Sequence, residues 1–513
     1  MLDSLSWKRD TPAAHPEIGA KMRRNCYYGT DRDAAVRVSV LAIVFLCATV
    51  LMQSAPAVAP AQEPQVLAFI GGRVIPGDGS APIENAAFVV RAGKITQVGT
   101  KGSVKVPKEA MQVDLSGKTV IPMIEELHVH IGYMKNGATD PNVKDGMGVL
   151  GGHVSKDYYT RENILDELRR FRYYGVGAVQ SLGTDRNDLE LQIRNEQRSG
   201  KLKDDTLALL FTADDGIVAY NNGNENGGPP FARDVVHEAR TPEDARAFVR
   251  QEASKKVDVI KFWLDDRYHT KPLMAQAIYE AIIDEAHKEH LRVIAHVVDL
   301  EAAKAAARAG VDGLAHPPHD KVVDDEFLQL MKQHDVFQCS TMSSSMPDRA
   351  WLDEPELAET VPVAYRDYVK AMRMPGGSTQ SGDPNAPSRA YSLMLINEKK
   401  ESDAGIRIVI SGDTAGGEGR FPGYTEHREL QALAEAGIPP LQVIRDGTQV
   451  SADALGLRDM DSLVTGKRAD FIVLDANPLD EMKNTRKISA VYVDGRAIDR
   501  AAMREHWTGV SGR

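Results

Sequence analysis

The chain has 513 residues, of which 42% are hydrophobic and 6% aromatic, which is enough for one large globular domain and a smaller one. Its formal net charge is -11, and the sequence holds no basic run suited to a phosphate backbone. These features exclude nucleic acid as an expected partner.

Residues 1–61 are predicted to be a leader and signal peptide. A basic segment at residues 21–24 precedes the apolar run 38–52, and small residues follow up to Ala61, after which cleavage is expected. The run is short for a membrane-spanning helix, although a retained N-terminal anchor is the alternative. We expect export to a bacterial periplasm or secretion, with no stable membrane association afterwards. Only Cys339 then remains, so the mature chain cannot form an internal disulfide.

Short strands with tight turns are predicted near both ends of the mature chain. Residues 62–118 include "VLAFIGGRVIP" and "AAFVVRAGKITQVGT", and residues 451–513 include "GKRADFIVLDANP" and "ISAVYVDGRAID". The shared character of these two segments predicts one small β-rich unit that is assembled from both ends.

Residues 119–450 alternate apolar runs with helical stretches. The first run, "VIPMIEELHVHIG" at residues 120–132, is expected to be one strand. Seven more strands are expected in "VGAVQSLG", "TLALLFTA", "VDVIKFW", "LRVIAHV", "VDGLAHP", "DVFQCST" and "IRIVISGD". This alternation predicts an α/β protein, and eight units predict a closed (β/α)8 TIM barrel. The Gly/Pro/Ser-rich residues 374–390 are a predicted lid or mobile loop.

Imidazole and carboxylate groups recur where these strands end. In such a barrel the active site lies at the C-terminal ends of the strands. The six candidates are His128, His130, Lys261, His296, His316 and Asp413. Each has an ordinary structural interpretation by itself, such as a hydrogen-bonded histidine, a snorkelling lysine or a helix cap. Their joint pattern predicts a metal site of the zinc type that leaves a position open for water.

The pattern resembles that of the amidohydrolase superfamily. "VIPMIEELHVH" is similar to the first-strand signature of that family, and "GKRADFIVLDANP" and "VYVDGRAID" resemble the strands that close its β-sandwich domain. "ADALGL" resembles the helix that leads into them. The resemblance covers nearly the whole mature chain, and it points to the imidazolonepropionase-like and Xaa-Pro-dipeptidase-like branch. It implies a barrel at residues 119–450 and a β-sandwich made from residues 62–118 and 451–513.

The resemblance also implies roles for the six residues. His128 and His130 would hold one ion with Asp413, and His296 and His316 would hold the second. Lys261 would be carboxylated, and its carbamate would bridge two divalent ions, with zinc as the expected metal. Asp413 would also serve as general base. Imidazolonepropionases proper lack the bridging lysine, so Lys261 disfavours that activity.

The first-strand signature is not fully matched. Met123 stands where the family has glycine, Glu126 where it has aspartate, and Ala315 where many relatives have glutamate. None of these changes removes an expected ligand, and Glu126 still offers a carboxylate to the residues around the site.

Three residues are predicted substrate contacts: Tyr133, which follows the first histidine pair, and Tyr268 and His269, which lie on the loop after Lys261. The alternative is that they are ordinary polar loop residues.

These observations predict an exported binuclear metal-dependent hydrolase of a small molecule. The expected bond is an amide (C–N) bond, as in a dipeptide, an N-acyl amino acid or a cyclic amide. An ester or lactone is the first alternative, because the same hydroxide attacks any activated carbonyl. A non-catalytic binding protein is the second alternative, and the sequence leaves open whether the chain forms a homo-oligomer.

Overall fold

The computed structural model describes residues 65–134, 156–221, 228–267, 269–371, 386–417 and 419–509. The chain divides into two units, Met1–Glu63 and Pro64–Arg513, and all described residues belong to the second. The predicted leader, Tyr268 and most of residues 374–390 therefore lie outside the described residues. Among the helices that are described, none has the length and apolar character needed to cross a membrane.

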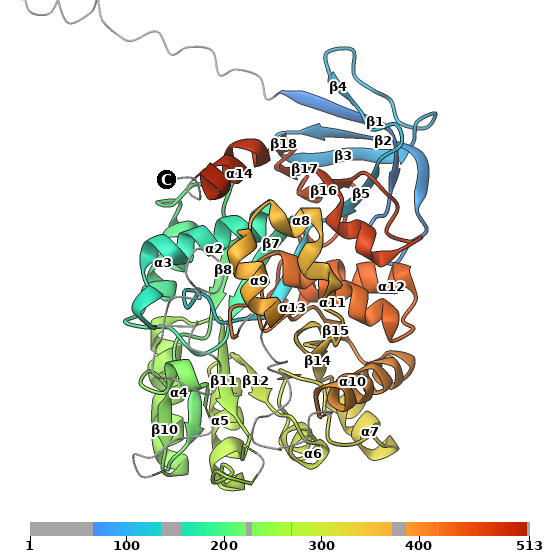
Figure 1. The fold of residues 1–513 in the computed structure, drawn as a ribbon. Coiled ribbons are helices and arrows are strands. Elements are labelled where there is room, and N and C mark those ends of the chain that lie inside the picture. Colours follow the sequence, from blue (N-terminus) through green and yellow to red (C-terminus); the bar gives the residue numbers. More distant parts are fainter. Residues whose placement is uncertain are drawn as a thin grey trace, which may run out of the picture. The chain divides into compact units, whose positions relative to one another are not determined.

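One eight-stranded sheet joins both ends of the described chain. Its strands are β1 (Val66–Val74), β2 (Ile83–Arg91), β3 (Lys94–Thr100), β4 (Met111–Asp114), β5 (Thr119–Pro122), β16 (Phe471–Leu474), β17 (Ile488–Val493) and β18 (Arg496–Ala497). The order is β18-β17-β16-β5-β1-β2-β3, and β4 also pairs with β1 (Figure 1). Aromatic side chains fill its core, because Phe69 stacks on Phe88 at 4.7 Å between ring centroids and Phe471 packs edge-on against both.

All eight strands predicted between these ends are present. They are β6 (Ile124–Val129), β7 (Val176–Ser181), β8 (Leu209–Thr212), β11 (Val259–Trp263), β12 (Arg292–His296), β13 (Gly313–Leu314), β14 (Phe337–Cys339) and β15 (Ile408–Val409). Two further short strands, β9 (Ile217–Ala219) and β10 (His237–Ala239), extend the sheet beside β11. All the pairings among these ten strands are parallel, as expected for an α/β protein.

Helices lie between these strands and after them. They are α2 (Arg161–Tyr173), α3 (Leu189–Ser199), α4 (Pro242–Lys255), α5 (Gln276–Lys288), α6 (Leu300–Arg308), α7 (Asp325–Gln333), α8 (Pro355–Ala358), α9 (Val363–Ala371), α10 (Ala386–Asp403), α11 (Tyr424–Glu435), α12 (Pro440–Arg445), α13 (Ser451–Leu455) and α14 (Arg500–Gly509). Thr160, Thr241, Asp299 and Asp324 accept backbone hydrogen bonds at the starts of α2, α4, α6 and α7. These local caps define where those four helices begin.

The parallel strands form two hydrogen-bonded sheets, β6-β7-β8 and β10-β9-β11-β12-β13-β14-β15. Backbone hydrogen bonds connect the two sheets at two places. Leu127 donates to the carbonyl of Ile410 at 3.0 Å, which joins β6 to the residue after β15. Asp258 donates to the carbonyl of Thr212 at 3.0 Å, which joins the start of β11 to β8.

The prediction that residues 120–132 form a single strand is wrong. The chain breaks at Met123, where β5 ends and β6 begins. β5 pairs with β1 and β16, whereas β6 pairs with β7, so the two halves belong to different sheets. Pro122 lies at the break, and a proline has no N–H with which to continue a ladder.

Candidate metal centre

His128 and His130 come from the end of β6, and their side chains lie on one side of the strand. Their Nε2 atoms are 3.3 Å apart. Oδ1 of Asp413, four residues beyond β15, lies 3.5 Å from Nε2 of His128 and 3.3 Å from Nε2 of His130. One ligand atom from each of the three residues lies within 4.8 Å of the others, so they form a candidate metal site.

The other ring nitrogen of each histidine has a partner of its own. Nδ1 of His128 lies 3.4 Å from the carbonyl oxygen of Ala315, and Nδ1 of His130 lies 3.1 Å from Oγ1 of Thr184. Partners of this kind fix the orientation of an imidazole ring and leave the second nitrogen for a metal. The backbone of Asp413 has a φ of +49°, so this left-handed turn sets the direction of its carboxylate.

His296 and His316 form a second pair. His296 is the last residue of β12 and His316 follows β13 by two residues, and Nδ1 of His296 lies 3.0 Å from Nε2 of His316. The outer nitrogens again have partners, since Nε2 of His296 lies 3.1 Å from Oδ2 of Asp265 and Nδ1 of His316 lies 2.8 Å from Oγ1 of Thr341. The rings of His128 and His316 lie 5.1 Å apart between centroids, so the two groups are neighbours.

Lys261 lies within β11 and is fully buried. Its Nζ has no hydrogen-bond partner among the described residues, and the centroid of the Trp263 ring is 5.2 Å away. Burial lowers the pKa of this amine to about 7, against an opposing effect of the Asp413 charge. The charge of Lys261 in turn lowers the pKa of four imidazoles, those of His128, His130, His296 and His316.

The imidazoles are held in the neutral form that binds metal ions. Burial lowers the pKa of His130 to about 3 and that of His296 to about 4. Burial also keeps the pKa values of His128 and His316 well below the usual range. Nitrogen and oxygen donors that face one another in a buried space, with an unpartnered amine beside them, fit a site for divalent ions of the zinc type.

Four residues around these ligands were not identified from the sequence: Thr184, Asp265, Thr341 and Arg420. Thr184, Asp265 and Thr341 each lie within hydrogen-bond distance of the ring nitrogen of a histidine that is not directed at the other candidate ligands, as described above. Arg420 forms an ion pair with Oδ2 of Asp413, and its Nη1 also donates to the Asp413 carbonyl at 3.2 Å. Asp265 had a sequence signal, because it follows Lys261 by four residues at the same strand end.

The structure describes two of the three predicted substrate contacts. Tyr133 is fully buried, and its hydroxyl donates to the carbonyl of Thr184 at 2.6 Å. The side chain of His269 is 92% exposed and lies 2.6 Å from Asp266. Tyr268 lies outside the described residues. Their roles toward a substrate stay predictions.

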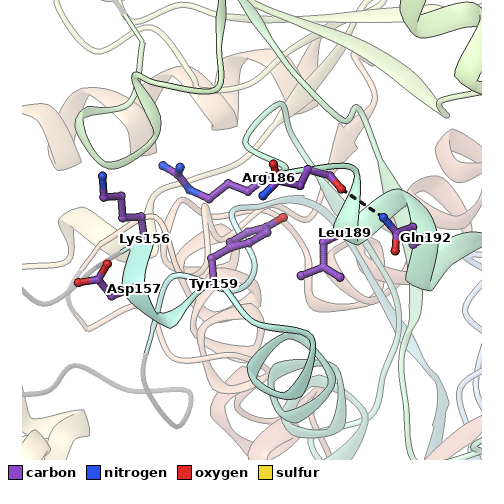
Figure 2. Close-up of a pocket in the computed structure, with 7 residues that line it drawn as sticks. Lys156, Asp157, Tyr159, Arg186, Leu189 and Gln192 are labelled. Carbon is purple, nitrogen blue, oxygen red and sulfur yellow. Dashed lines mark hydrogen bonds between the residues drawn. The ribbon is translucent and has the colours of Figure 1, made fainter.

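A separate pocket of about 440 Å³ lies near the turns that follow β6 and β7. It is lined by Lys156, Asp157, Tyr159, Arg186, Asn187, Leu189 and Gln192. Figure 2 shows the side chains of Tyr159 and Arg186 between Lys156 on one side and Leu189 on the other. The guanidinium of Arg186 is also placed over the ring of Tyr133, 5.6 Å from its centroid. None of the six predicted ligands lines this pocket.

Known proteins share this fold. Ochratoxinase from Aspergillus niger is 24% identical over 467 residues, which cover 85% of this chain and 86% of the relative. The structure of phenylurea hydrolase B matches with a TM-score of 0.65 at 20% identity, over 85% of this chain and 98% of that one. A Xaa-Pro dipeptidase with methionine bound in its active site matches with a TM-score of 0.63 at 20% identity, over 85% of this chain and 100% of that one.

The model of the Amidohydrolase family matches residues 133–498, well over half of the chain. The match begins just after the histidine pair of β6 and does not include it. The assignment of His128 and His130 as candidate ligands therefore rests on the sequence pattern and the structure. The chain therefore belongs to the amidohydrolase family, and the prediction of a hydrolase that acts on carbon–nitrogen bonds is confirmed.

Proposed function

We propose that the protein is an exported, binuclear metal-dependent hydrolase of an amide bond in a dipeptide, an N-acyl amino acid or a cyclic amide. The observation that carries this proposal is the buried, unpartnered amine of Lys261 beside two groups of facing ligand atoms. A neutral lysine amine can add carbon dioxide, and the resulting carbamate is an anion that two cations stabilise. The amine's lowered pKa, about 7, makes the neutral form available near neutral pH.

His128, His130 and Asp413 would hold one divalent ion, His296 and His316 the other, and the carbamate of Lys261 would bridge them. Zinc is the proposed metal. Bound divalent ions acidify a water molecule to a pKa near ~7 and polarise a carbonyl oxygen. Asp413 accepts the proton of the attacking water and passes it to the leaving nitrogen.

One similar structure supports an amide substrate that contains an amino acid, because it is that of a Xaa-Pro dipeptidase with methionine bound in its active site. By analogy, the leaving group in this protein is an amino acid or a related amine.

We also propose that the two parallel sheets form one closed (β/α)8 barrel and that the eight-stranded sheet belongs to a β-sandwich. The backbone hydrogen bonds that join β6 to Ile410 and β8 to Asp258 support closure. The predicted domain boundaries at residues 62–118, 119–450 and 451–513 stay predictions. The pairing of β5 with β1 and β16 favours a first segment that extends to Pro122.

Metal content per chain tests the binuclear site. The mature protein, expressed with bicarbonate present, is expected to hold about two zinc-like ions per chain by plasma mass spectrometry. Lys261→Ala should reduce this number, whereas the matched control Lys288→Ala, at an exposed position of α5, should not. One ion or none in the wild-type protein would overturn the binuclear proposal.

A panel of substrates tests which type of bond the protein hydrolyses. Dipeptides, N-acyl amino acids and cyclic amides are expected to be hydrolysed more efficiently than matched esters and lactones. A higher kcat/KM for lactones would favour the esterase alternative. N-terminal sequencing of the protein from the culture medium or periplasm tests export, with Gln62 as the expected first residue.

A further inference from the structure

Trp263 is placed beside Lys261 by the alternation of β11. Residues two apart on a strand point to the same side, so Lys261 and Trp263 share one face of the strand and Phe262 lies on the other. Phe262 stacks on Tyr279 of α5 at 6.5 Å between ring centroids, so its face is the one that a helix covers. Trp263 therefore belongs to the face that carries the predicted ligand.

The indole of Trp263 packs on the backbone of two glycines. Gly183 follows β7, Gly216 directly precedes β9, and the N–H of Gly216 donates to the carbonyl of Gly183 at 3.1 Å. A Cβ at Gly216 would lie 2.2 Å from Cζ3 of the indole, and a Cβ at Gly183 would lie 3.1 Å from Cη2. Gly216 does not have a positive φ. The contact with the indole, and not the backbone conformation, is therefore what excludes a larger residue at position 216.

The same surroundings enclose the side chain of Lys261. A Cβ at Gly183 would lie 3.1 Å from Cγ of Lys261, and the Lys261 Nζ lies 5.2 Å from the centroid of the Trp263 ring. On the neighbouring strand, His296 pairs with Trp263, and their ring centroids are 6.4 Å apart. The Lys261 amine has no hydrogen-bond partner among the described residues. Its position therefore depends on the packing of its stem and not on a polar contact.

We propose that Trp263 is a positioning residue that, held against Gly183 and Gly216, fixes Lys261 in the orientation in which it can bridge two ions. The inference rests on the proposed carbamate-bridged site and identifies the side chain that prepares it. A lysine stem is flexible, and a ligand must be held within about 0.5 Å of its working position by residues that packing keeps in one rotamer. The indole meets this requirement because the backbone of Gly216 already limits its movement.

The carbamate step needs no reactant other than carbon dioxide. The nitrogen of the neutral amine bonds to the carbon of carbon dioxide, and one amine proton leaves to the solvent. Trp263 takes no part in this bond formation. Its effect is on where the resulting anion lies.

Zinc affinity and carbamate content test the inference. With zinc and ¹³C-bicarbonate, the wild-type protein is expected to bind about two ions per chain and to show a carbamate signal by ¹³C NMR. Trp263→Leu should lower the affinity for zinc by about 10- to 100-fold and weaken that signal, and Trp263→Phe, which keeps a flat ring, should restore part of both. Gly216→Ala displaces the indole without replacing it and should act like Trp263→Leu. Gly102→Ala is its control, because a Cβ there meets no atom within 4 Å.

Phe262→Leu is the matched control for a general loss of packing. It removes a buried ring from the opposite face of the same strand, so it should lower the Tm as Trp263→Leu does but keep the zinc affinity and the carbamate signal. An equal loss of zinc affinity in Phe262→Leu and Trp263→Leu would overturn the inference. Unchanged zinc affinity in both Trp263→Leu and Gly216→Ala would also overturn it.

Chemical labelling of the metal-free protein separates this inference from the proposed function. Cyanate modifies lysine, because the amine nitrogen bonds to the cyanate carbon and an amine proton moves to the cyanate nitrogen. The labelling rate of Lys261, divided by that of the exposed Lys288 and measured by peptide mass spectrometry, should rise several-fold in Trp263→Leu and Gly216→Ala. Phe262→Leu should keep the wild-type ratio.

The outcomes of this labelling have distinct meanings. If the wild-type protein binds no zinc and forms no carbamate, but the labelling ratio rises as expected, the proposed bridged site fails and the positioning of Lys261 by Trp263 stands. Equal labelling ratios in wild type, Trp263→Leu and Gly216→Ala would overturn the inference whatever the zinc content.

Discussion

The side chain of Glu126 accepts a hydrogen bond from the backbone N–H of Gly412 at 2.9 Å, although 286 residues separate them in the chain. Its other oxygen accepts from the N–H of His128 at 2.7 Å. One buried carboxyl group therefore connects the strand that carries two predicted ligands to the turn that carries Asp413. Glu126 stands where the resemblance predicts aspartate, and its side chain reaches both N–H groups.

Glu126→Gln should weaken both the fold and the metal site. Glutamine has one acceptor oxygen, so its NH2 group would face one of the two N–H groups. We expect the free energy of unfolding in urea to fall by about 1–3 kcal/mol. Metal affinity, measured by titration, should fall by about 10- to 100-fold. The exposed Glu109→Gln is the control, and an unchanged metal affinity in Glu126→Gln would contradict the role assigned to Glu126.

Asp265→Ala should affect the second pair of histidines selectively. Oδ2 of Asp265 lies 3.1 Å from Nε2 of His296, which directs Nδ1 toward His316. Without this partner the ring can rotate or change tautomer, so the affinity of the second ion should fall by about 10- to 100-fold. Stepwise metal titration should show one tight ion and one weak ion, whereas Asp284→Ala on the surface of α5 should keep two. Equal loss of both ions would argue for a general structural defect.

Lys261→Met should increase the stability of the metal-free protein and reduce the stabilisation that metal provides. Removal of a buried amine that has no partner is expected to raise the free energy of unfolding of the metal-free protein by about 1–3 kcal/mol. Zinc and bicarbonate should then increase the Tm of the wild-type protein more than that of the variant. An equal increase in both proteins would show that Lys261 takes no part in metal binding.

Asp446→Asn should flatten the dependence of stability on pH. Burial raises the pKa of Asp446 to about 8, whereas in the unfolded chain this carboxyl titrates near ~4. The folded protein therefore holds a proton that the unfolded chain has lost, so wild-type stability declines as the pH rises from about 4 to about 8. Asparagine has no proton to lose. Thermal unfolding at two pH values should show the difference. At pH 9 the variant should be more stable than the wild-type protein by on the order of a few kcal/mol. At pH 5 the two proteins should have similar stability.

The control for this experiment is Asp367→Asn, at an exposed position of α9. Its Tm should follow that of the wild-type protein at every pH. A constant difference between wild type and Asp446→Asn across this range would contradict the assigned titration.

That the candidate ligands lie close together could be expected from the sequence, because alternate residues of a strand point to the same side. An apolar run that ends in His-x-His places both rings on one face, and the same logic located His296, His316 and Lys261. All eight strands were predicted for the same reason. The break at Met123 was not predicted, because both halves are extended and buried and their different pairing partners are not visible in the sequence.

Residues that act through loops could not be predicted. Arg420 reaches Asp413 because a glycine-rich turn folds back, and this geometry depends on backbone angles that apolar periodicity does not encode. Asp265 was visible beside Lys261, but its bond to His296 depends on the next strand. The short strands β9 and β10 were missed because segments of three residues give almost no periodic signal.

The backbone N–H of His130 donates a hydrogen bond to the carbonyl of Thr414, and this long-range contact has a consequence for the synthesis of the protein. Ribosomes make chains from the N-terminus at about 5–20 residues per second, so Asp413 follows the histidine pair after a delay on the order of tens of seconds. Throughout that interval the nascent chain contains His128 and His130 but not Asp413, the third residue of the candidate metal site. Under the proposed function, loading with metal would have to wait until Asp413 has been made, and a chain truncated before Asp413 would carry the two histidines without it.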